Sequence, residues 1–321
     1  MEKLIVSSSP HIHTNETVAG IMRDVIIALL PASIAGILFF GFRSAVVILT
    51  AVAACMVSEW AFEKLTNKPI TTGDLSAAVT GMILGMNMPV GIPLWMVVIG
   101  SVFAIVVVKQ LYGGLGKNFL NPALAARCFM VIAWAGAMTT YVPAAFSGVD
   151  AVTSATPLEV MKNGAEGYMP SLLGAFLGVK GGCIGETSGL CLLLGFIYLL
   201  IRRVIDCKIP LCFILTFAVL TFFFGKNGDM QQWYYTLMQV LTGGLLFGAF
   251  FMATDYVTTP TTPAGQIVFG IGCGILTFVI RKFGGYPEGV SFAILLMNVA
   301  TPLIENATKP RVFGVEGGRA K

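Results

Sequence analysis

The stretch GVDAVTSATPLEVMKNG, residues 148–164, concentrates hydroxyl groups in a chain that is otherwise mostly apolar. Thr153, Ser154 and Thr156 lie among small residues just before Pro157, so we expect exposed hydroxyls that could carry a covalent modification. The same residues also fit a helix start, with Thr156 as N-cap, Pro157 as first helical residue and Glu159 as the third, as in a capping box. Residue types alone favour capping and leave both interpretations open.

Arg127, in the stretch NPALAARCF, lies inside an apolar segment. An arginine at the centre of a membrane span costs about 2.5–3.5 kcal/mol, so it should face a partner or a polar cavity. We therefore consider Arg127 as a ligand contact. The alternative is an arginine that snorkels from the helix start at Pro122.

The stretch KGGCIGETSG, residues 180–189, is rich in glycine and opens an apolar segment. Backbone N–H groups at a helix N-terminus attract anions, so Gly182 and Gly185 are candidate binding positions. The alternative is a Ser- or Thr-capped helix entry in which Glu186 stabilises the positive end of the helix dipole. The stretch is not a P-loop, because the GK[ST] signature is missing.

Acidic residues near membrane depth are functional candidates. Asp255 closes a glycine-rich apolar segment and precedes a run of threonines, while Glu59 and Asp74 flank two earlier segments. Carboxylate, hydroxyl and carbonyl oxygens are the ligands that Na⁺ prefers, so Asp255 is the candidate ion ligand. The alternative is an aspartate that caps the loop.

Composition indicates what must position these residues. The chain has 321 residues, of which 56% are hydrophobic and 11% are charged, whereas soluble domains carry about 25% charged residues. The apolar residues come in blocks of about twenty, the length of a membrane-spanning helix. We therefore predict an all-α polytopic membrane protein without a cleavable signal. The seven cysteines lie mostly in apolar runs without a CxxC, which predicts no metal site, and the net charge of +4 gives no indication of nucleic-acid binding.

Ten apolar segments are predicted: 24–41, 44–62, 75–91, 93–111, 122–139, 184–201, 210–225, 235–253, 264–280 and 289–305. The sequence at 79–89 resembles that at 241–255, and the sequence at 111–133 resembles that at 280–300. Two copies of five spans must have opposite orientations, as in the inverted repeats of many transporters. The third and eighth segments are glycine-rich and interrupted, which indicates a binding site near the midplane or close helix packing.

The basic residues predict the orientation. With both termini inside, the inner side holds Lys3, Arg23, Lys64, Lys68, Lys109, Lys117, Arg202, Arg203, Lys208, Lys309, Arg311, Arg319 and Lys321. The outer side holds fewer: Arg43, Lys162, Lys180, Lys226, Arg281 and Lys282. The predicted organisation is a cytoplasmic arm (1–23), a first membrane repeat (24–139), an outer loop (140–183), a second membrane repeat (184–305) and a cytoplasmic tail (306–321).

The motifs, taken together, resemble the RnfD/NqrB family of membrane subunits of ion-pumping redox complexes. The landmarks that carry the resemblance occur in the family's order over nearly the whole chain: MRDVIIALLPA at 22–32, GKNFLNPALAARCF at 116–129, SATPL at 154–158, GGCIGETSGLCLLLG at 181–195 and FMATDYVTTPTTPAGQ at 251–266. The short N-terminal arm is more similar to the RnfD branch. The resemblance implies ten spans in two inverted five-helix repeats, with a fold like that of urea channels.

For the site, the resemblance implies FMN esterified through its phosphate to Thr156, with Ser154 and Ala155 small enough not to obstruct the modifying enzyme. The rest of the predicted cofactor-binding set is Asn121, Arg127, Gly182, Gly185 and Glu186. Members of the NqrB branch also hold a noncovalent riboflavin, so a second flavin is a further possibility to consider.

For function, the resemblance implies a D-type flavoprotein subunit that relays electrons between ferredoxin and NAD⁺ in a complex that pumps Na⁺ or H⁺. The implied partners are the A, B, C, E and G subunits of the Rnf complex, the lipid of a bacterial or archaeal cell membrane, and a flavin transferase; the D-type chain is not catalytic alone. Two alternatives are a solute channel or transporter of the same fold, and the B-type subunit of a Na⁺-pumping NADH:quinone reductase. Flavin absorbance would distinguish the flavoprotein from a channel or transporter, and a quinone acceptor would identify the B-type subunit.

Overall fold

The computed structural model describes residues 17–144, 155–164, 168–225 and 230–310. Within these ranges the chain forms helices and no strands. The first half contains α1 (Val18–Phe40), α2 (Phe42–Leu65), η1 (Thr72–Asp74), α3 (Ser76–Met86), α4 (Leu94–Val102), η2 (Phe103–Gln110), α5 (Pro122–Ala133) and α6 (Ala135–Thr139). The connection between the halves contains α7 (Pro157–Asn163), α8 (Leu172–Leu177) and η3 (Ile184–Glu186). The second half contains α9 (Gly189–Ile201), α10 (Lys208–Phe224), α11 (Gln232–Leu241), α12 (Leu245–Phe247), η4 (Gly248–Met252), α13 (Pro263–Phe283) and α14 (Val290–Thr308).

Four helices are long and apolar enough to cross a membrane, namely α1, α2, α13 and α14. The pair formed by α11 and the segment from α12 through η4 makes a fifth span if it is counted as one helix bent by 58°. Five further apolar helices are only 10–17 residues long, whereas a straight span needs about twenty. The described chain is thus a helical membrane protein with four or five candidate spans. Ten spans remain a prediction, although every predicted apolar segment overlaps a helix.

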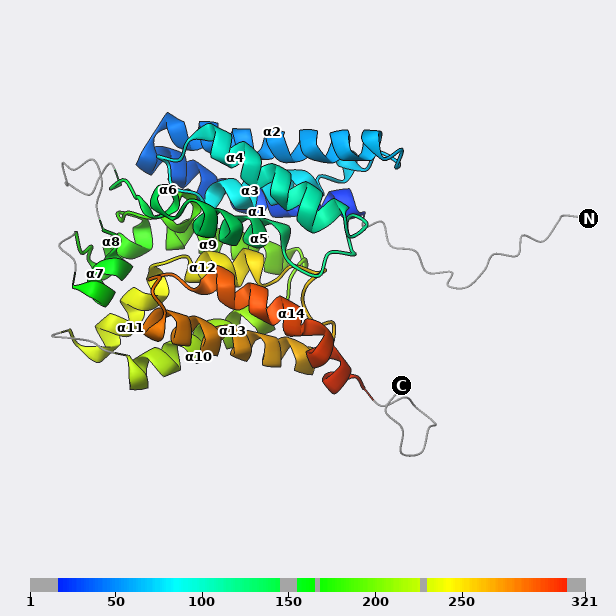
Figure 1. Ribbon diagram of the computed structural model, residues 1–321. Helices are drawn as coiled ribbons and strands as arrows, with labels where there is room; N and C mark the ends of the chain where they lie inside the picture. Colours follow the sequence, from blue (N-terminus) through cyan, green and yellow to red (C-terminus); the bar gives the residue numbers. More distant parts are fainter. Residues whose placement is uncertain (1–16, 145–154, 165–167, 226–229, 311–321) are drawn as a thin grey trace, which may run out of the picture.

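The two halves of the chain lie in two layers (Figure 1). In the first half, α2 packs on α3 and α4; in the second, α10 packs on α11 and α13. The helices α1 and α9 contact each other across the two halves. This correspondence is the packing that the sequence repeat leads one to expect, and the inverted orientation of the repeats stays a prediction.

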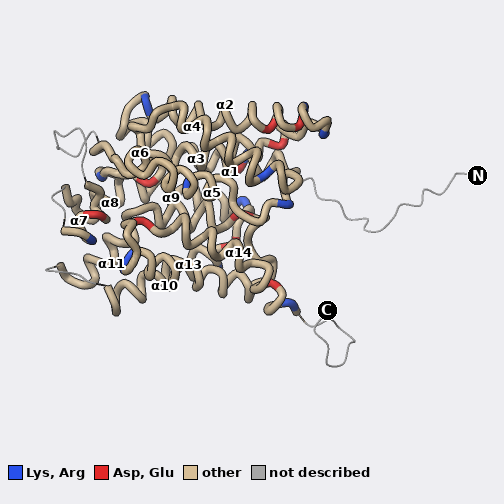
Figure 2. The backbone as a smooth tube through the Cα atoms, in the orientation of Figure 1, with Lys and Arg blue, Asp and Glu red and all other residues tan. Residues whose placement is uncertain are grey.

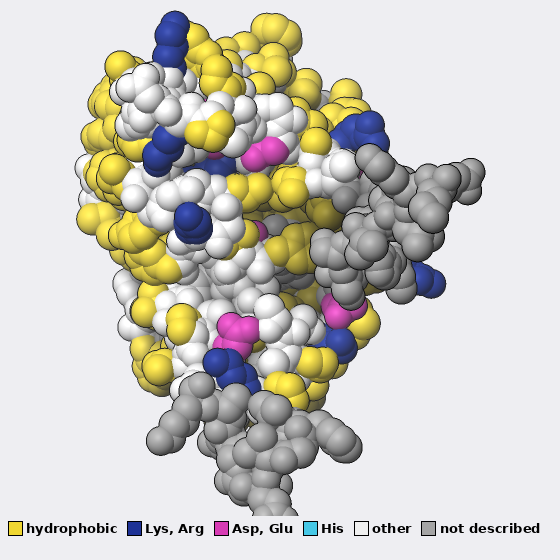
Figure 3. Space-filling view, turned by 90° about the vertical axis from the view of Figure 1, so that its right-hand side faces the viewer, with side chains coloured by type: hydrophobic (Ala, Val, Ile, Leu, Met, Phe, Trp, Pro, Cys, Tyr) yellow, Lys and Arg dark blue, Asp and Glu magenta, His cyan; other side chains and the backbone are white. Residues whose placement is uncertain are grey.

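The described chain begins and ends at the same end of the molecule. α1 begins and α14 ends at the same end of the bundle, while α7 and α8 lie at the opposite end (Figure 1). Lys and Arg side chains are spread over the end where α1 begins, around a recess with hydrophobic side chains (Figure 3). Below, "inner end" means the end where α1 begins and "outer end" the end with α7.

Several helices start at side-chain caps. Asn121 caps α5 with Pro122 in the first turn, and its Oδ1 accepts from the N–H groups of Ala123 (3.1 Å) and Leu124 (3.3 Å). Ser188 caps α9, which therefore begins at Gly189 instead of the predicted residue 184. The predicted segment 122–139 is divided because Trp134 leaves the helical conformation (φ −135°, ψ 55°).

The bend after α11 is set by two glycines. Gly243 (φ 69°) and Gly244 (φ 67°) adopt left-handed backbone that other residues rarely adopt. A Cβ atom at Gly243 would lie 2.8 Å from Nη2 of Arg281, and one at Gly244 would lie 2.6 Å from Oε1 of Glu186. The bend thus lets two buried charged side chains approach the backbone closely.

Candidate functional site

Thr156 caps the short helix α7. Its Oγ1 accepts a hydrogen bond from the N–H of Glu159 at 3.3 Å, and Pro157 follows as the first helical residue. The capping interpretation is therefore confirmed. The expectation of an exposed hydroxyl is wrong for Thr156, which is buried, as are Pro157 and Leu158 next to it in the chain. Ala155 is half-buried, and Thr153 and Ser154 lie outside the described residues.

Arg127 on α5 is the centre of a buried network at the outer end. Its Nη1 donates to Oδ1 of Asn87 (3.1 Å) and to Oγ of Ser291 (2.9 Å). Its Nη2 forms ion pairs with Glu288 and, at 3.5 Å, with Glu186. Only 5% of Arg127 is exposed, so it does not snorkel. The network instead joins the end of α3 in the first half to the start of α14 in the second.

The glycine-rich stretch lies inside this network. Glu186 belongs to η3 and is buried, and a Cβ at Gly182 would lie 3.5 Å from its Oε2. Gly185 packs against Met86, where a Cβ would lie 2.7 Å from the methionine side chain. These glycines therefore serve close packing around Glu186, and the helix that follows is capped by Ser188, as the alternative interpretation predicted.

Lys180 is the second buried cation beside Glu186. The sequence predicts an outer loop at this position, but the side chain is only 3% exposed and donates to the carbonyl of Leu241. Burial lowers the pKa of Lys180 to about 8, partly offset by the charge of Glu186. Lys180 thus ties the connection between the halves to the end of α11.

A pocket of about 830 Å³ opens beside the Arg127 network. Arg127, Tyr141 and Glu288 line it from the membrane side, and Glu159 and Asn163 of α7 line it from the outer side. Tyr286 and Phe292, whose rings stack with centroids 6.4 Å apart, complete an aromatic wall. Sites for small molecules combine such walls with a few converging polar groups.

Three possible metal ligands meet in the same network. The ligand atoms of Cys183, Glu186 and Glu288 lie within 4.8 Å of one another. Arg127 donates to all three, at 3.5 Å to Sγ of Cys183, so its guanidinium already supplies the positive charge there. The sequence predicts no metal site, and the spacing of these residues along the chain gives no signal of the cluster.

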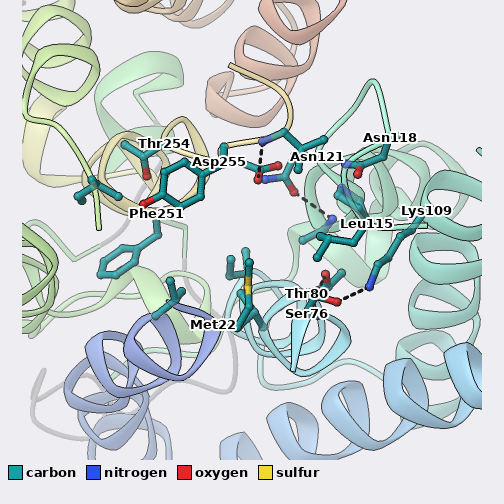
Figure 4. Close-up of a pocket in the computed structure, with 18 of the residues that line it drawn as sticks. Met22, Ser76, Thr80, Lys109, Leu115, Asn118, Asn121, Phe251, Thr254 and Asp255 are labelled. Carbon is teal, nitrogen blue, oxygen red and sulfur yellow. Dashed lines mark hydrogen bonds between the residues drawn. The ribbon is translucent and has the colours of Figure 1, made fainter. Parts of the chain in front are cut away.

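Asn121 and Asp255 lie in a different pocket, of about 770 Å³, at the inner end. They face Ser76 and Thr80 across this pocket (Figure 4). Asp255 accepts from Val257 N–H (3.4 Å) and from Thr258 Oγ1 (3.1 Å), so it caps its own loop. The structure therefore separates Asn121 from Arg127 and Glu186: Asn121 lines the inner pocket, whereas Arg127 and Glu186 belong to the outer network.

A second buried charge network lies beside the inner pocket, and sequence reasoning missed it. Lys109, predicted at the inner end of the segment 93–111, is 2% exposed and forms a 2.6 Å ion pair with Glu59 on α2. It also donates to Oγ of Ser76 at 2.5 Å (Figure 4). Gln110 donates to Glu59 (2.9 Å) and Glu63 (3.3 Å). Lys109 follows a long apolar run, and that position was the one available signal of its burial.

Sequence comparison places these features among known proteins. The chain matches the profile of the NQR2, RnfD, RnfE family over residues 5–314. It is 48% identical over 316 residues, 97% of this chain and 96% of the relative, to the D subunit of the Na(+)-translocating ferredoxin:NAD(+) oxidoreductase complex of Acetobacterium woodii. It is 46% identical over 324 residues, 96% of each chain, to the D subunit of the proton-translocating ferredoxin:NAD(+) oxidoreductase complex of Clostridium ljungdahlii. The D subunit of an ion-translocating oxidoreductase complex of Halorhodospira halophila is 36% identical over 340 residues, 96% of this chain and 94% of the relative. The chain therefore belongs to the NQR2, RnfD, RnfE family.

Proposed function

We propose that this chain is the D subunit of an ion-translocating ferredoxin:NAD⁺ oxidoreductase complex and carries FMN esterified to Thr156. The observation that supports the proposal best is the position of Thr156 at the start of α7, the helix whose Glu159 and Asn163 line the same pocket as Arg127. The names of the relatives supply the electron donor and acceptor, and the family resemblance supplies the flavin.

The residues around Thr156 fit a flavin phosphate ester. The Tyr286 and Phe292 rings of the pocket offer an aromatic surface to a planar ring system. Thr156 Oγ1 accepts the capping hydrogen bond, so replacing its hydroxyl hydrogen by a phosphoryl group leaves an oxygen in the capping position. FMN supplies reversible electron transfer when it is bound.

The protein's own residues would hold this pocket in shape. Arg127 fixes Glu288 and Ser291 at the pocket wall, and Tyr141 donates to Oε1 of Glu288 at 3.4 Å. Because these donors and acceptors already have partners, the wall is organised before any ligand enters, which reduces the ordering that binding requires. A buried Thr156 further implies that flavin transfer precedes the final packing of α7 or requires its opening.

The test of the ester compares Thr156→Ala, Thr156→Ser and the wild type, each produced with its flavin transferase. The wild type should give a fluorescent band on a denaturing gel under ultraviolet light, because a covalent flavin survives denaturation. Thr156→Ala should give none, and Thr156→Ser little if the transferase selects threonine. Ser171→Ala is the matched control, because Ser171 caps α8 by the same kind of bond, from Gly174 N–H at 3.1 Å. A fluorescent Thr156→Ala band would contradict the proposal.

The ion pathway is the finer part of the proposal. We take Asp255 as a ligand of the transported Na⁺ or H⁺, supported by its carboxylate in the lining of the inner pocket and by the hydroxyl of Thr258 that donates to it. Asp255→Asn keeps the shape of the loop cap, so it should impair pumping by proteoliposomes more than flavin content. Unchanged pumping and unchanged cation dependence would leave Asp255 as a loop cap only.

We further propose ten spans in two inverted repeats, cytoplasmic termini and assembly with the A, B, C, E and G subunits. The basic residues at the inner end support the orientation (Figure 3). A cysteine introduced at Ala165 should react with an impermeant thiol reagent on whole cells. Labelling only after the membrane is opened would reverse the orientation. A second, noncovalent flavin stays a prediction that extraction of the purified chain can test.

A further inference from the structure

A second pocket at the outer end, of about 550 Å³, lies on the side of α7 away from Arg127. It is formed where α7, α10, α11 and α13 meet. Leu158, Met161, Phe217 and Phe278 contribute apolar walls, and Tyr235 and Gln239 contribute polar groups. Basic segments near α7 and α11 are visible at this end in Figure 2.

Three cations line this pocket and no carboxylate does. Arg281 donates to the carbonyls of Gln239 (2.6 Å), Thr242 (3.1 Å) and Gly243 (2.8 Å). Lys162 donates to the carbonyls of Gly284 (2.5 Å) and Tyr286 (2.9 Å), and Lys282 lies over the rings of Phe278 and Phe283. All these partners are neutral. Among the residues that the structure describes, none of the three cations forms an ion pair.

Burial makes this excess of positive charge costly. The sequence predicts an outer loop for Arg281, but it is only 6% exposed and lies in the last turn of α13. Burial and the nearby charge of Arg281 lower the pKa of Lys162. Lys282 is exposed at the rim, and Glu186 and Glu288 act on Arg281 electrostatically without forming an ion pair with it. A cluster of three cations without an ion-paired carboxylate attracts anions into the space between them.

Two buried polar atoms on residues that line the pocket have no hydrogen-bond partner, Nε of Arg281 and Oγ1 of Thr221. A buried donor without an acceptor is destabilising by more than an ordinary hydrogen bond is stabilising. Arg281 as a cap for the carbonyls at the end of α11 accounts for its two Nη atoms. This capping leaves the Nε of Arg281 without an acceptor and does not involve Lys162 or Lys282. The pocket therefore has donors available for an anion that carries several acceptor oxygens.

The surroundings indicate the source of the anion. Phe223, Phe224 and Phe283 are 71%, 58% and 73% exposed on the ends of α10 and α13, and Trp233 is exposed at the start of α11. Aromatic side chains gather where a protein meets the membrane–water interface. An apolar border adds nothing to the binding of a free ion. It can, however, contact the acyl chains of a lipid whose phosphate lies in the pocket.

We propose that this pocket binds the phosphate of an anionic phospholipid headgroup through Lys162, Arg281 and Lys282. Arginine and lysine form charge-assisted hydrogen bonds with phosphate oxygens, and the acyl chains lie along the apolar surfaces of α10 and α13. The site is separate from the pocket beside Arg127, although both use α7. The lipid therefore braces the helix that starts at Thr156 on its opposite face.

The experiment titrates the full-length, flavinylated chain with phosphatidylglycerol or phosphatidylcholine in detergent and counts bound lipids by native mass spectrometry. Removing two of the three cations, in Lys162→Gln/Lys282→Gln, should weaken the first phosphatidylglycerol about 30-fold, taking each lysine as one surface contact. Lys162→Arg/Lys282→Arg keeps the charges and should retain binding. Arg281 is left intact because its Nη atoms hold the end of α11.

The matched control is Lys64→Gln/Lys68→Gln at the inner end. Lys64 also ends a long helix and lies over a ring, that of Trp60, and Lys68 also donates to a backbone carbonyl, that of Gln110. This variant should bind phosphatidylglycerol as the wild type does. Equal unfolding temperatures of the two glutamine variants show that the comparison reports binding.

Three results would overturn the proposal. The first is phosphatidylglycerol binding that is the same in the wild type and the Lys162→Gln/Lys282→Gln variant, or no stronger than phosphatidylcholine binding. The second is displacement of the lipid by inorganic phosphate at equal concentration, which would make a free ion the ligand. The third is binding that appears only in Thr156→Ala, which would assign the pocket to the flavin's own phosphate.

Discussion

The two buried charge networks of this protein contain similar residues, but they connect different parts of the chain. Each has a cation among buried acceptors and two glutamates: Arg127 with Glu186 and Glu288 at the outer end, Lys109 with Glu59 and Glu63 at the inner end. The outer network joins residues from both halves of the chain, up to 164 positions apart. The inner network lies within residues 59–110, on α2, α3 and η2.

This difference follows from the cation. A guanidinium presents several donors in a fixed plane, so Arg127 can bond to Asn87, Ser291 and both carboxylates at once. An ammonium is a compact charge, and Lys109 reaches only Glu59 and Ser76 among the described residues. We infer that the outer network couples the two halves beside the pocket that Arg127 and Glu288 line, while the inner network stabilises the first half.

The largest effect is expected from Arg127→Met. Removing one partner of a buried ion pair costs about 3–5 kcal/mol, because the remaining charge is left uncompensated, and here two carboxylates lose their partner. The variant should unfold at a much lower temperature in detergent, and the second half should lose its protection from proteolysis together with the first. Arg127→Lys keeps the charge but loses hydrogen bonds, so its unfolding temperature should lie between those of the wild type and Arg127→Met. Loss of protection in one half only would contradict the coupling role.

A smaller effect is expected from Lys109→Met, because one carboxylate loses its ion-pair partner while Gln110 still donates to it. Replacing both partners of a buried pair is often neutral, so Glu59→Gln/Lys109→Met should recover most of the stability. A double-mutant cycle, with unfolding followed in the same detergent, measures the interaction energy between Glu59 and Lys109. The comparison between the networks fails if Lys109→Met destabilises the chain more than Arg127→Met does.

The smallest effect is expected at a pair of the inner end whose cation is exposed. Arg202 Nη2 lies 3.1 Å from Asp24; the Asp24 side chain is only 10% exposed, but that of Arg202 is 54% exposed. Because water screens the exposed guanidinium and Tyr198 still donates to Asp24 at 3.0 Å, Arg202→Gln should shift the unfolding temperature less than the other two variants do. This variant supplies the baseline for the other two, since it separates loss of a charge from loss of a buried charge. A shift as large as that of Lys109→Met would show that exposure does not separate these sites.

The helices were predictable because each depends on a local pattern. Apolar blocks and caps such as Asn121 and Thr156 are properties of neighbouring residues, and the structure confirms them. The end of α5 at Trp134 and the start of α9 at Gly189 were missed by a few residues, because apolar composition continues past each boundary.

The networks were not predictable, because their members are far apart in the chain. Arg127 was recognised from its place in an apolar segment, but nothing local connects it to Glu288, 161 positions away. Lys109 was assigned to the inner end of a segment and Arg281 to an outer loop, because charge normally marks a segment end. Tertiary packing overrides that rule where an ion-pair partner or a row of carbonyls is available. The burial of Thr156 also lacks a local signal, since the neighbouring Leu158 packs against Gly243 in the second half of the fold.

The central claim is that Thr156 carries FMN beside the Arg127 network. Its most direct test is mass spectrometry of the chain purified from cells that contain the flavin transferase, first intact and then as peptides. The account predicts the mass of one esterified FMN on the intact chain, located by fragmentation to Thr156 in the peptide that contains SATPLEVMK, and absent from Thr156→Ala. An unmodified Thr156 in flavin-replete cells, or FMN on Thr153 or Ser154 instead, would contradict it.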